Sequence, residues 1–243
     1  MLEPLLLTVT KIQTFAGDNH LTNATGFFFE RERRLFLVTS RHVLVDEPTG
    51  HRPDRIQIEL HTNSENLARS TGFSILLYRG GISIWRQGED KSGSIDVGVI
   101  ELERDELPDT AVITPFAPQN IPGPGAQPEI GSALLVVGFP LGFHDTLHHM
   151  PVVRHAIIAS SFGLRFQGNG YFLADGRTHR GTSGAPVVMR LADDQRASDN
   201  LPYYLLGIHS ARIDLGTRDL QIDEALGLNC TWYADILMTL TEA

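Results

Sequence analysis

Short apolar or alternating runs, each bounded by turn residues, follow one another along most of the chain. Alternation of apolar and polar positions is the pattern of a half-buried β-strand, and the flanking turn residues limit its length. Such runs occupy residues 5–15, 24–29, 34–39, 56–60, 73–78, 95–102, 133–138, 152–160, 170–174, 185–189 and 203–209. Many short strands with few helical stretches predict an all-β sandwich or barrel.

The clearest helical pattern is at the end of the chain. Thr231 stands where an N-cap residue would, and the following segment, WYADILMTLTEA, places its apolar positions on one face of a helix. We therefore expect a C-terminal helix that begins after Thr231. The one dense basic stretch, RERR at residues 31–34, lies between two apolar runs and is interpreted as a hairpin turn.

A proline-rich segment divides the chain. Residues 103–131 contain six prolines, namely Pro108, Pro115, Pro118, Pro122, Pro124 and Pro128. Because proline has no N–H to donate to a sheet ladder, this stretch is poor strand material. We predict a front β-barrel over residues 1–105, a linker over residues 106–130 and a rear β-barrel over residues 131–243.

Composition limits the classes of function. The chain has 243 residues, 42% hydrophobic and 20% charged, which is typical of a globular domain with a sizeable core. The formal net charge of -9 and the single basic run do not favour a nucleic-acid partner. Cys230 is the one cysteine, so no intrachain disulfide can form.

The amino terminus does not have the pattern of a targeting segment. It lacks the basic start of a signal peptide, and its apolar run is only three leucines long. No window reaches the apolar length of a membrane span. We therefore predict no membrane partner and take the cytoplasm as the default location.

Ser183 is the first candidate for chemistry, in the segment GRTHRGTSGAPVV. Gly181 and Gly184 flank it in a tight turn that leaves its hydroxyl open and aims backbone N–H groups into one small space. An oxyanion hole needs fixed donors of this kind where negative charge develops. An ordinary turn has the same composition, so Ser183 alone does not decide the function.

A serine hydroxyl needs a neighbouring base, and the base needs an orienting carboxylate. His42 follows the apolar run LFLVT in a short polar turn, and Asp96 heads the apolar run of SIDVGVIEL. An acid at the head of such a strand is costly to bury unless it is paired. The plain alternatives are a surface histidine and an exposed aspartate, but the order His, Asp, Ser is that of the chymotrypsin-type enzymes.

In that same order the chain carries ATGFFFE, LVTSRHV, SIDVGVIEL, VVGFPLGF, RGTSGAPVV and LLGIHSAR, over residues 24–212. These segments resemble the trypsin-like serine peptidases, especially the bacterial HtrA-like and glutamyl-endopeptidase-like branches. The resemblance implies two antiparallel six-stranded β-barrels packed together, with the triad His42, Asp96 and Ser183 in the cleft between them. It also implies that the N–H groups of Gly181 and Ser183 form the oxyanion hole, and that no cofactor is needed.

The function implied is a serine endopeptidase that hydrolyses polypeptides through an acyl-enzyme. Two alternatives stay open. One is a pseudoprotease that uses the cleft to bind peptides. The other is a protease domain that is inactive until an activating protein partner orders the oxyanion loop. In relatives activated from zymogens, an aspartate precedes the serine and pairs with a newly cut amino terminus, whereas this chain has Thr182 there.

The resemblance extends to the S1 pocket, which holds the substrate residue before the cut. Glutamyl endopeptidases resemble this chain in a Gly-Ile-His run, here ending at His209, and in a threonine five residues before the serine, here Thr178. Arg177 falls where trypsin-like pockets place an acid. With Ser210 and Arg212 on the same strand as His209, these residues predict cleavage after Glu or Asp. The alternative makes His209 a core residue and leaves the arginines in solvent.

Two further features have plain interpretations. His144, His148 and His149 lie close together with Asp145 in FHDTLHHM, a cluster that could bind a metal. We interpret it as a surface loop beside the cleft and predict no metal site. Cys230 lacks a setting that would stabilise a thiolate, so we interpret it as an inert, half-buried cysteine.

Overall fold

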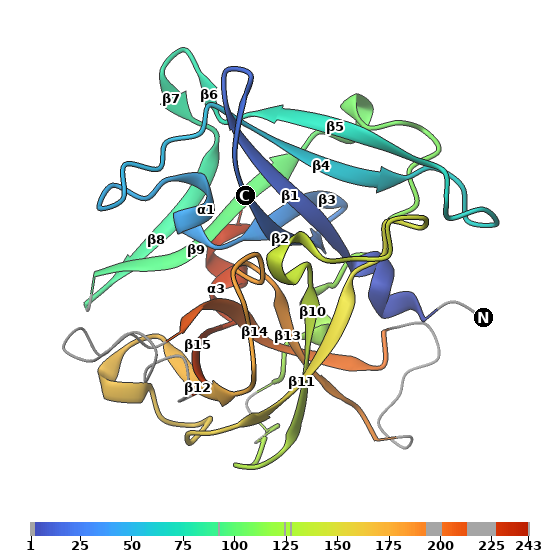
Figure 1. Cartoon of the computed structure of the whole chain (residues 1–243). Coiled ribbons are helices and arrows are strands. Elements are labelled where there is room, and N and C mark those ends of the chain that lie inside the picture. The colour runs from blue at the N-terminus through green and yellow to red at the C-terminus, as the bar shows by residue number, and fades with distance from the viewer. Residues whose placement is uncertain are drawn as a thin grey trace.

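The computed structural model describes residues 3–91, 93–123, 125–126, 128–192, 201–212 and 227–242. Its strands form a front sheet from the first half of the chain and a closed barrel from the second half, one above the other in Figure 1. Every named strand pairs with its neighbours in antiparallel fashion. The predicted all-β fold is confirmed.

The front sheet has seven strands in the order β5-β4-β1-β2-β3-β9-β8, and a small hairpin, β6-β7, stands beside it. The strands are β1 (Val9–Ala16), β2 (Asn19–Arg31), β3 (Arg34–Thr39), β4 (Arg55–His61), β5 (Ser70–Leu76), β6 (Tyr78–Arg79), β7 (Ile82–Ser83), β8 (Trp85–Asp90) and β9 (Gly93–Leu102). A short helical turn, η1 (Pro4–Thr8), precedes β1, and helix α1 (Arg41–Leu44) follows β3.

The basic run at residues 31–34 forms the predicted hairpin turn. Arg31 is the last residue of β2 and pairs with Arg34, the first residue of β3. Glu32 and Arg33 between them have φ angles of 54° and 68°. Two consecutive residues in this left-handed region match the right-handed twist of the flanking strands, as in the favoured two-residue hairpins.

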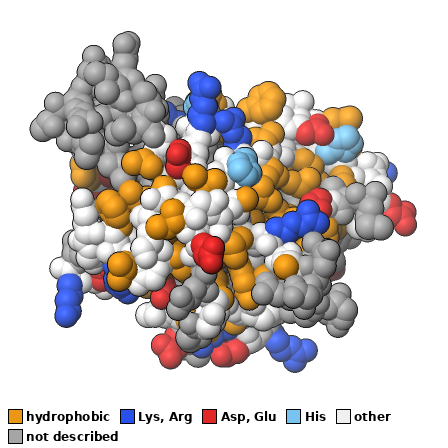
Figure 2. Space-filling view, turned by 90° about the horizontal axis from the view of Figure 1, so that it is seen from below, with side chains coloured by type: hydrophobic (Ala, Val, Ile, Leu, Met, Phe, Trp, Pro, Cys, Tyr) orange, Lys and Arg blue, Asp and Glu red, His pale blue; other side chains and the backbone are white. Residues whose placement is uncertain are grey.

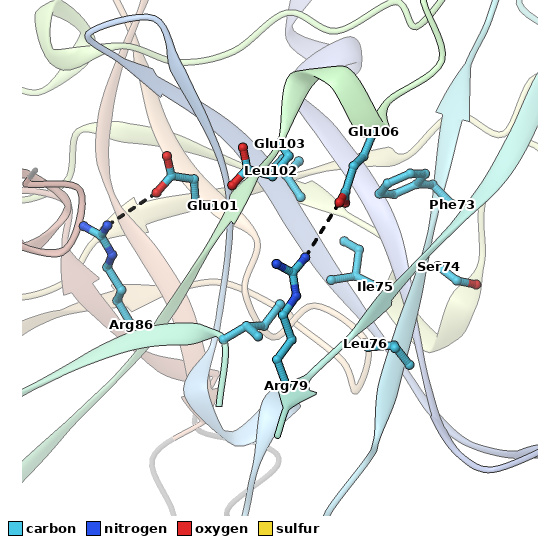
Figure 3. A pocket seen from close by; sticks show the side chains of 11 residues that line it. Phe73, Ser74, Ile75, Leu76, Arg79, Arg86, Glu101, Leu102, Glu103 and Glu106 are labelled. Carbon is cyan, nitrogen blue, oxygen red and sulfur yellow. Dashed lines mark hydrogen bonds and ion pairs between the residues drawn. The ribbon is translucent and has the colours of Figure 1, made fainter. Parts of the chain in front are cut away.

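The front portion differs from the predicted six-stranded barrel. Its sheet has seven strands, and among the described residues its outer strands β5 and β8 do not pair with each other. Residues of both strands instead line a cavity of about 460 Å³, where Arg79 lies 3.8 Å from Glu106 (Figure 3). The pattern of apolar positions did not predict β8. Its segment, WRQGED, is largely polar and partly exposed, as is possible for an outer strand.

The rear half closes into the predicted six-stranded barrel in the order β10-β11-β12-β15-β14-β13. Its strands are β10 (Ala133–Gly138), β11 (Val152–Ile158), β12 (Tyr171–Asp175), β13 (Pro186–Arg190), β14 (Tyr203–Arg212) and β15 (Leu228–Tyr233). The short helical turns η4 (Pro140–Gly142) and η5 (Phe166–Gly168) lie in its loops, and helix α3 (Ile236–Leu240) follows β15.

The proline-rich segment joins β9 to β10 and holds two helical turns, η2 (Arg104–Glu106) and η3 (Pro118–Asn120), with none of its described residues in a named strand. It is anchored on the front sheet, since Phe116 is fully buried and bridges to Phe29 of β2. The segment therefore bonds to the backbone of the front sheet at Phe116 and at Val112, which bridges to His61 of β4, on its way to the rear barrel. The exact division at residues 105 and 130 stays a prediction.

The predicted start of the last helix is wrong. Thr231 lies inside β15, where it pairs with Phe172 of β12 and His209 of β14, and α3 begins only at Ile236, after Asp235. Strand pairing on both sides of Thr231 stabilises the extended conformation more than a helix cap at this residue would stabilise a helix. The helix itself is where the pattern placed it, with Leu237 and Leu240 buried.

One hydrophobic cluster spans the boundary between the two halves. It joins Phe29 and Val97 of the front sheet to Val137 of the rear barrel and Leu237 of α3, while two smaller clusters fill the individual halves. On the face shown in Figure 2, hydrophobic side chains spread over much of the area, and acidic and basic side chains lie singly among and around them.

Candidate active site

His42 lies on helix α1, which directly follows β3, and Asp96 lies on the neighbouring strand β9. The backbone N–H of His42 donates to Asp96 Oδ1 at 2.8 Å, and His42 Nδ1 is 2.7 Å from Asp96 Oδ2. Because an ionised carboxylate only accepts hydrogen bonds, Nδ1 carries the proton of this pair. The imidazole therefore keeps Nε2 for a second partner, as a general base requires.

The close packing of α1 on β9 explains this geometry. A Cβ on Gly98 would lie 2.7 Å from Leu44 Cδ1 and 3.7 Å from Arg41 Cα, so the glycine leaves room for the Leu44 side chain where α1 packs on the strand. The ladder between β3 and β9 ends at Thr39 and Gly98, just before the helix. His42 is thus placed beside Asp96 by a short helix that begins just after the strand ladder ends.

Burial and pairing act in opposite directions on the two titratable groups. Burial alone would lower the pKa of His42, but the hydrogen bond and charge of Asp96, with the charge of Asp46, leave that pKa raised. Burial alone would raise the pKa of Asp96, but the hydrogen bonds and charge of His42 and the hydroxyl of Ser210 leave it lowered. Each group favours the charged form of the other.

Ser210 supplies a third hydrogen bond to Asp96. Its side chain is buried on β14 of the rear barrel, and its hydroxyl donates to Asp96 Oδ2. The sequence placed Ser210 in the S1 pocket, but the structure directs its hydroxyl to the carboxylate of the front half. Nothing local indicates this contact, because the two residues are 114 positions apart.

Ser183, the predicted nucleophile, lies on the loop between β12 and β13, which we name the nucleophile loop after this prediction (residues 176–185). The N–H of Thr25 in β2 donates to the Ser183 carbonyl at 3.0 Å. The His209 carbonyl accepts from Gly184 N–H at 2.8 Å and from the Ser40 hydroxyl at 3.1 Å. Since Ser40 stands two residues before His42, these bonds bring the loop to the segment that carries the histidine.

Two peptide planes of the nucleophile loop have fixed directions. The Arg180 carbonyl accepts from Leu141 N–H at 2.5 Å, and the Thr182 carbonyl accepts from Ala185 N–H at 2.9 Å. Because a trans peptide points its N–H opposite to its carbonyl, the N–H groups of Gly181 and Ser183 point away from these bonds. Within the part of the chain that the structure describes, neither N–H has a protein acceptor. They form a pair of unused donors beside Ser183.

Thr182 takes the position where zymogen-activated relatives are expected to have an aspartate. Its side chain is buried, and its hydroxyl has no hydrogen-bond partner among the described residues. It therefore does not fix the nucleophile loop through its side chain. The loop is held from outside, by Thr25 of β2 and by the turn that contains Leu141.

Two of the S1 candidates line one side of β15. Thr178 is buried, and its hydroxyl donates to Asn229 Oδ1 at 2.5 Å. His209 is also buried and pairs across the ladder with Thr231. Residues two apart on a strand face the same way, so Asn229 and Thr231 present one polar strip to both candidates.

Asn229 and Thr231 were not predicted for this pocket. The amide nitrogen of Asn229 donates to the carbonyls of Gly176 and Gly227, both at 2.7 Å, which orients its oxygen toward Thr178. The available signal was the alternation of polar Asn229 and Thr231 with Leu228, Cys230 and Trp232. Arg177 is exposed, and the side chain of Arg212 lies outside what the structure describes.

The histidine-rich loop engages its own backbone and one acid. His144 Nδ1 is 2.6 Å from the Gly142 carbonyl, and His148 Nδ1 is 2.7 Å from Asp145 Oδ2 in a largely exposed pair. Among the described residues, no three His, Cys, Asp or Glu side chains are grouped so that they could hold a metal ion. Cys230 is partly buried on β15, and burial raises the pKa of its thiol to about 11. None of the helices described is long and apolar enough to cross a membrane.

Solved structures share the fold. The serine endoprotease from Yersinia pestis has a TM-score of 0.55 and 15% identity, over 97% of this chain and 62% of that protein. The active form of a protease from M. tuberculosis, Rv3671c, has a TM-score of 0.54 and 14% identity, over 98% of this chain and 82% of that protein. This chain thus spans less than two thirds of the Yersinia enzyme, and at these identities the likeness shows the fold alone.

No curated protein matches the chain in sequence. The model of the trypsin-like peptidase domain matches residues 24–192, which is more than half of the chain and includes His42, Asp96 and Ser183. The chain therefore belongs to the trypsin-like peptidase domain family.

Proposed function

We propose that this protein is a serine endopeptidase in which His42, Asp96 and Ser183 act as the triad. The observation that carries the proposal is the pairing of His42 with Asp96 next to a loop that offers Ser183 and two unused N–H groups. A base, an orienting carboxylate, a nucleophile and oxyanion donors are the parts that acyl transfer needs.

The chemistry follows from these parts. Ser183 Oγ attacks the carbonyl carbon of the substrate while His42 Nε2 takes the hydroxyl proton. The N–H groups of Gly181 and Ser183 stabilise the oxyanion, and the proton on His42 passes to the amine that leaves as the C–N bond breaks. Water then attacks the acyl-enzyme by the same route, which releases the acid and restores the Ser183 hydroxyl. The substrate proposed is a polypeptide.

Activation by a partner is the second candidate. The absence of an aspartate at Thr182 favours it, because the usual intrachain lock on the loop is missing. The bonds from Leu141 N–H and the Thr25 hydroxyl favour a loop that is ordered without a partner. We therefore place activity of the chain alone first, and activation by a protein partner second.

For specificity we propose a preference for Glu or Asp before the cut. His209 carries an imidazole donor of the kind that holds a carboxylate, and it stands on the polar strip of Asn229 and Thr231. Thr178 already donates its one hydroxyl proton to Asn229 Oδ1, so its part is to fix that strip. The hydroxyl of Thr231 has no partner among the described residues, so the strip retains hydrogen-bonding capacity. Arg177, exposed at the start of this segment, adds positive charge nearby.

The test is cleavage of a proteome-derived peptide library, read by mass spectrometry, with Ser183→Ala beside the wild type. Cuts that disappear in Ser183→Ala are expected, because loss of the nucleophile removes nearly all acyl transfer. A cut pattern that is the same in both proteins would refute the endopeptidase. Absence of cuts in both would favour the partner-activated or peptide-binding alternatives.

Specificity is tested in the same library with His209→Ala and, as a matched control, His155→Ala. His155 is an exposed histidine on β11 of the same barrel. Enrichment of Glu or Asp before the cut should be lost in His209→Ala and kept in His155→Ala. An acidic preference that survives His209→Ala would rule out His209 as the carboxylate ligand.

A further inference from the structure

Thr25 connects the front sheet to the nucleophile loop through its side chain as well as its backbone. It is fully buried on β2. Its hydroxyl donates to the Gly181 carbonyl at 2.8 Å and accepts from Phe139 N–H at 3.1 Å. Its own N–H donates to the Ser183 carbonyl at 3.0 Å. One residue of the front half thus touches both residues whose N–H groups are the oxyanion donors.

We propose that Thr25 is a positioning residue that sets the direction of the Gly181 N–H in the oxyanion hole. This proposal rests on the proposed peptidase function. Thr25 touches no substrate. It acts through the peptide plane that follows Gly181, because its hydroxyl donates to the Gly181 carbonyl.

The two peptide planes that flank Gly181 are held by different segments. Leu141 N–H holds the carbonyl of Arg180, and the Thr25 hydroxyl holds the carbonyl of Gly181. Gly181 has a φ of 90°, which glycine adopts at little cost. The intrinsic backbone preference of this residue therefore does not fix its conformation. With both planes pinned, the N–H of Gly181 keeps one direction. Without the Thr25 bond, one of the two planes is released.

Two glycines let the backbone of the rear half approach Thr25 closely. A Cβ on Gly138 would lie 2.6 Å from the Thr25 hydroxyl oxygen, and a Cβ on Gly184 would lie 2.3 Å from the Thr25 carbonyl oxygen. The Thr25 carbonyl also accepts from the Thr39 hydroxyl at 2.8 Å. Two glycines of the rear barrel therefore permit a fit in which the threonine hydroxyl has one donor and one acceptor at fixed positions.

Two substitutions distinguish the role of the Thr25 hydroxyl from that of the side-chain shape. Thr25→Val keeps the branched shape but loses the donor to Gly181 and the acceptor for Phe139 N–H. Thr25→Ser keeps the hydroxyl and loses only a methyl group. Removing a direct oxyanion donor lowers kcat by about 100- to 1000-fold, so an indirect loss through Thr25→Val should lower kcat by about 10- to 100-fold. KM should change by less than about 3-fold, because substrate binding contacts are untouched.

A matched control exists within the front sheet. Thr10 on β1 is buried, and its hydroxyl donates to the Glu59 carbonyl at 2.8 Å and accepts from Glu59 N–H at 3.1 Å. These are the same distances and the same roles as at Thr25, but both partners lie on β4. Thr10→Val should therefore lower stability as Thr25→Val does and leave kcat unchanged.

The experiment measures kcat and KM on a peptide substrate taken from the library, for the wild type, Thr25→Val, Thr25→Ser and Thr10→Val, at equal concentrations of folded protein. The expected result is a kcat loss for Thr25→Val alone, with Thr25→Ser within about 3-fold of the wild type. Equal kcat for Thr25→Val and Thr10→Val would overturn the proposal, and so would an equal loss in Thr25→Ser.

Hydrogen exchange provides a readout that does not depend on activity. In the nucleophile loop, the amides of Thr182, Gly184 and Ala185 have backbone acceptors. Thr25→Val should accelerate their exchange, whereas Thr10→Val should not. If the wild type cleaves nothing, faster exchange in Thr25→Val still supports the positioning role while the peptidase function fails. Unchanged exchange overturns the positioning role whether or not the protein is a peptidase.

Discussion

Asp96 accepts hydrogen bonds from the His42 backbone, the His42 imidazole and the Ser210 hydroxyl. Burial alone would destabilise its charge, and these donors reverse that effect, so the pKa of Asp96 is lowered. The same carboxylate outweighs the burial of His42, whose pKa is raised. A carboxylate that stays ionised at neutral pH therefore sets the basicity of the histidine beside it.

This pairing predicts the acidic limb of the pH–rate profile. His42 must be neutral to accept the Ser183 proton, so kcat/KM should fall as the pH falls through the raised pKa of His42. The midpoint should lie above the ordinary value for histidine, about 6.5. Steady-state cleavage from acidic to neutral pH measures this midpoint.

The control variant is Asp96→Asn, which removes the charge that raises the pKa of His42. We expect kcat to fall by about 10⁴-fold, as when a triad aspartate is replaced in enzymes of this type, and the residual limb to move to lower pH. An acidic limb at the same pH in Asp96→Asn would mean that the midpoint belongs to another group.

At the scale of elements, the nucleophile loop depends on close approach of backbone to backbone. Gly184 has a φ of 84°, and a Cβ there would lie 2.2 Å from Thr39 Oγ1 and 2.3 Å from the Thr25 carbonyl oxygen. Gly168 has nearly the same φ, 82°, but a Cβ there would meet nothing within 4 Å. Gly184 and Gly168 thus have the same backbone conformation, but only a side chain at position 184 would clash with neighbouring atoms.

Alanine at these two glycines should therefore have unequal effects. Gly168→Ala should lower the free energy of unfolding by about 1–2 kcal/mol, the usual cost of a left-handed conformation with a side chain. Gly184→Ala should lower it by at least about 2 kcal/mol more, because the strand and the loop must separate. Urea unfolding of both variants measures the difference. Equal losses would show that the loop can move away from β2 easily.

Some local structures could be predicted from the sequence, and others could not. The hairpin at Glu32 and Arg33 was predictable because a short polar run separates two apolar runs, and the turn around Ser183 because glycines at 181 and 184 allow positive φ. Thr231 was misplaced because the ladders that hold it come from β12 and β14, far away in sequence. For the same reason the contacts of Ser210 with Asp96 and of Thr25 with Gly181, 114 and 156 positions apart, could not be predicted.

At the scale of the whole molecule, helix α3 fastens the end of the chain to the front sheet. Arg31 of β2 donates to the Met238 carbonyl at 2.5 Å, and Arg86 of β8 donates to the Glu242 carbonyl. The first bond satisfies a carbonyl that the helix leaves open at its end, and the second fixes the chain just beyond the helix. Leu237 of the same helix is fully buried in the cluster shared by the two halves.

Truncation of Leu237 should therefore weaken the molecule as a whole. Leu237→Ala should lower the free energy of unfolding by about 2–5 kcal/mol, the usual effect of a cavity in a core. The control Thr239→Ala changes an exposed residue of the same helix and should stay within about 0.5 kcal/mol of the wild type. A small effect of Leu237→Ala would mean that α3 contributes little to joining the halves.

The shared cluster further predicts that the two halves unfold together, although their strands form separate sheets. Front residues such as Val97 and rear residues such as Val137 are packed in this one shared cluster and not in the clusters of the separate halves. The two tryptophans report on the halves separately, since Trp85 lies on β8 and Trp232 on β15. Trp232→Phe leaves the front reporter, and Trp85→Phe leaves the rear one.

In urea, each single-tryptophan variant should show the same midpoint by fluorescence as by circular dichroism, which reports on both halves. Adding Leu237→Ala to either variant should lower both midpoints by the same amount, because the lost contacts belong to one cluster. Fluorescence and circular dichroism midpoints that separate, or a Leu237→Ala effect confined to Trp232, would show that the front sheet folds on its own. The proposed triad would then draw its residues from two independent units, and its geometry would depend on how those units dock.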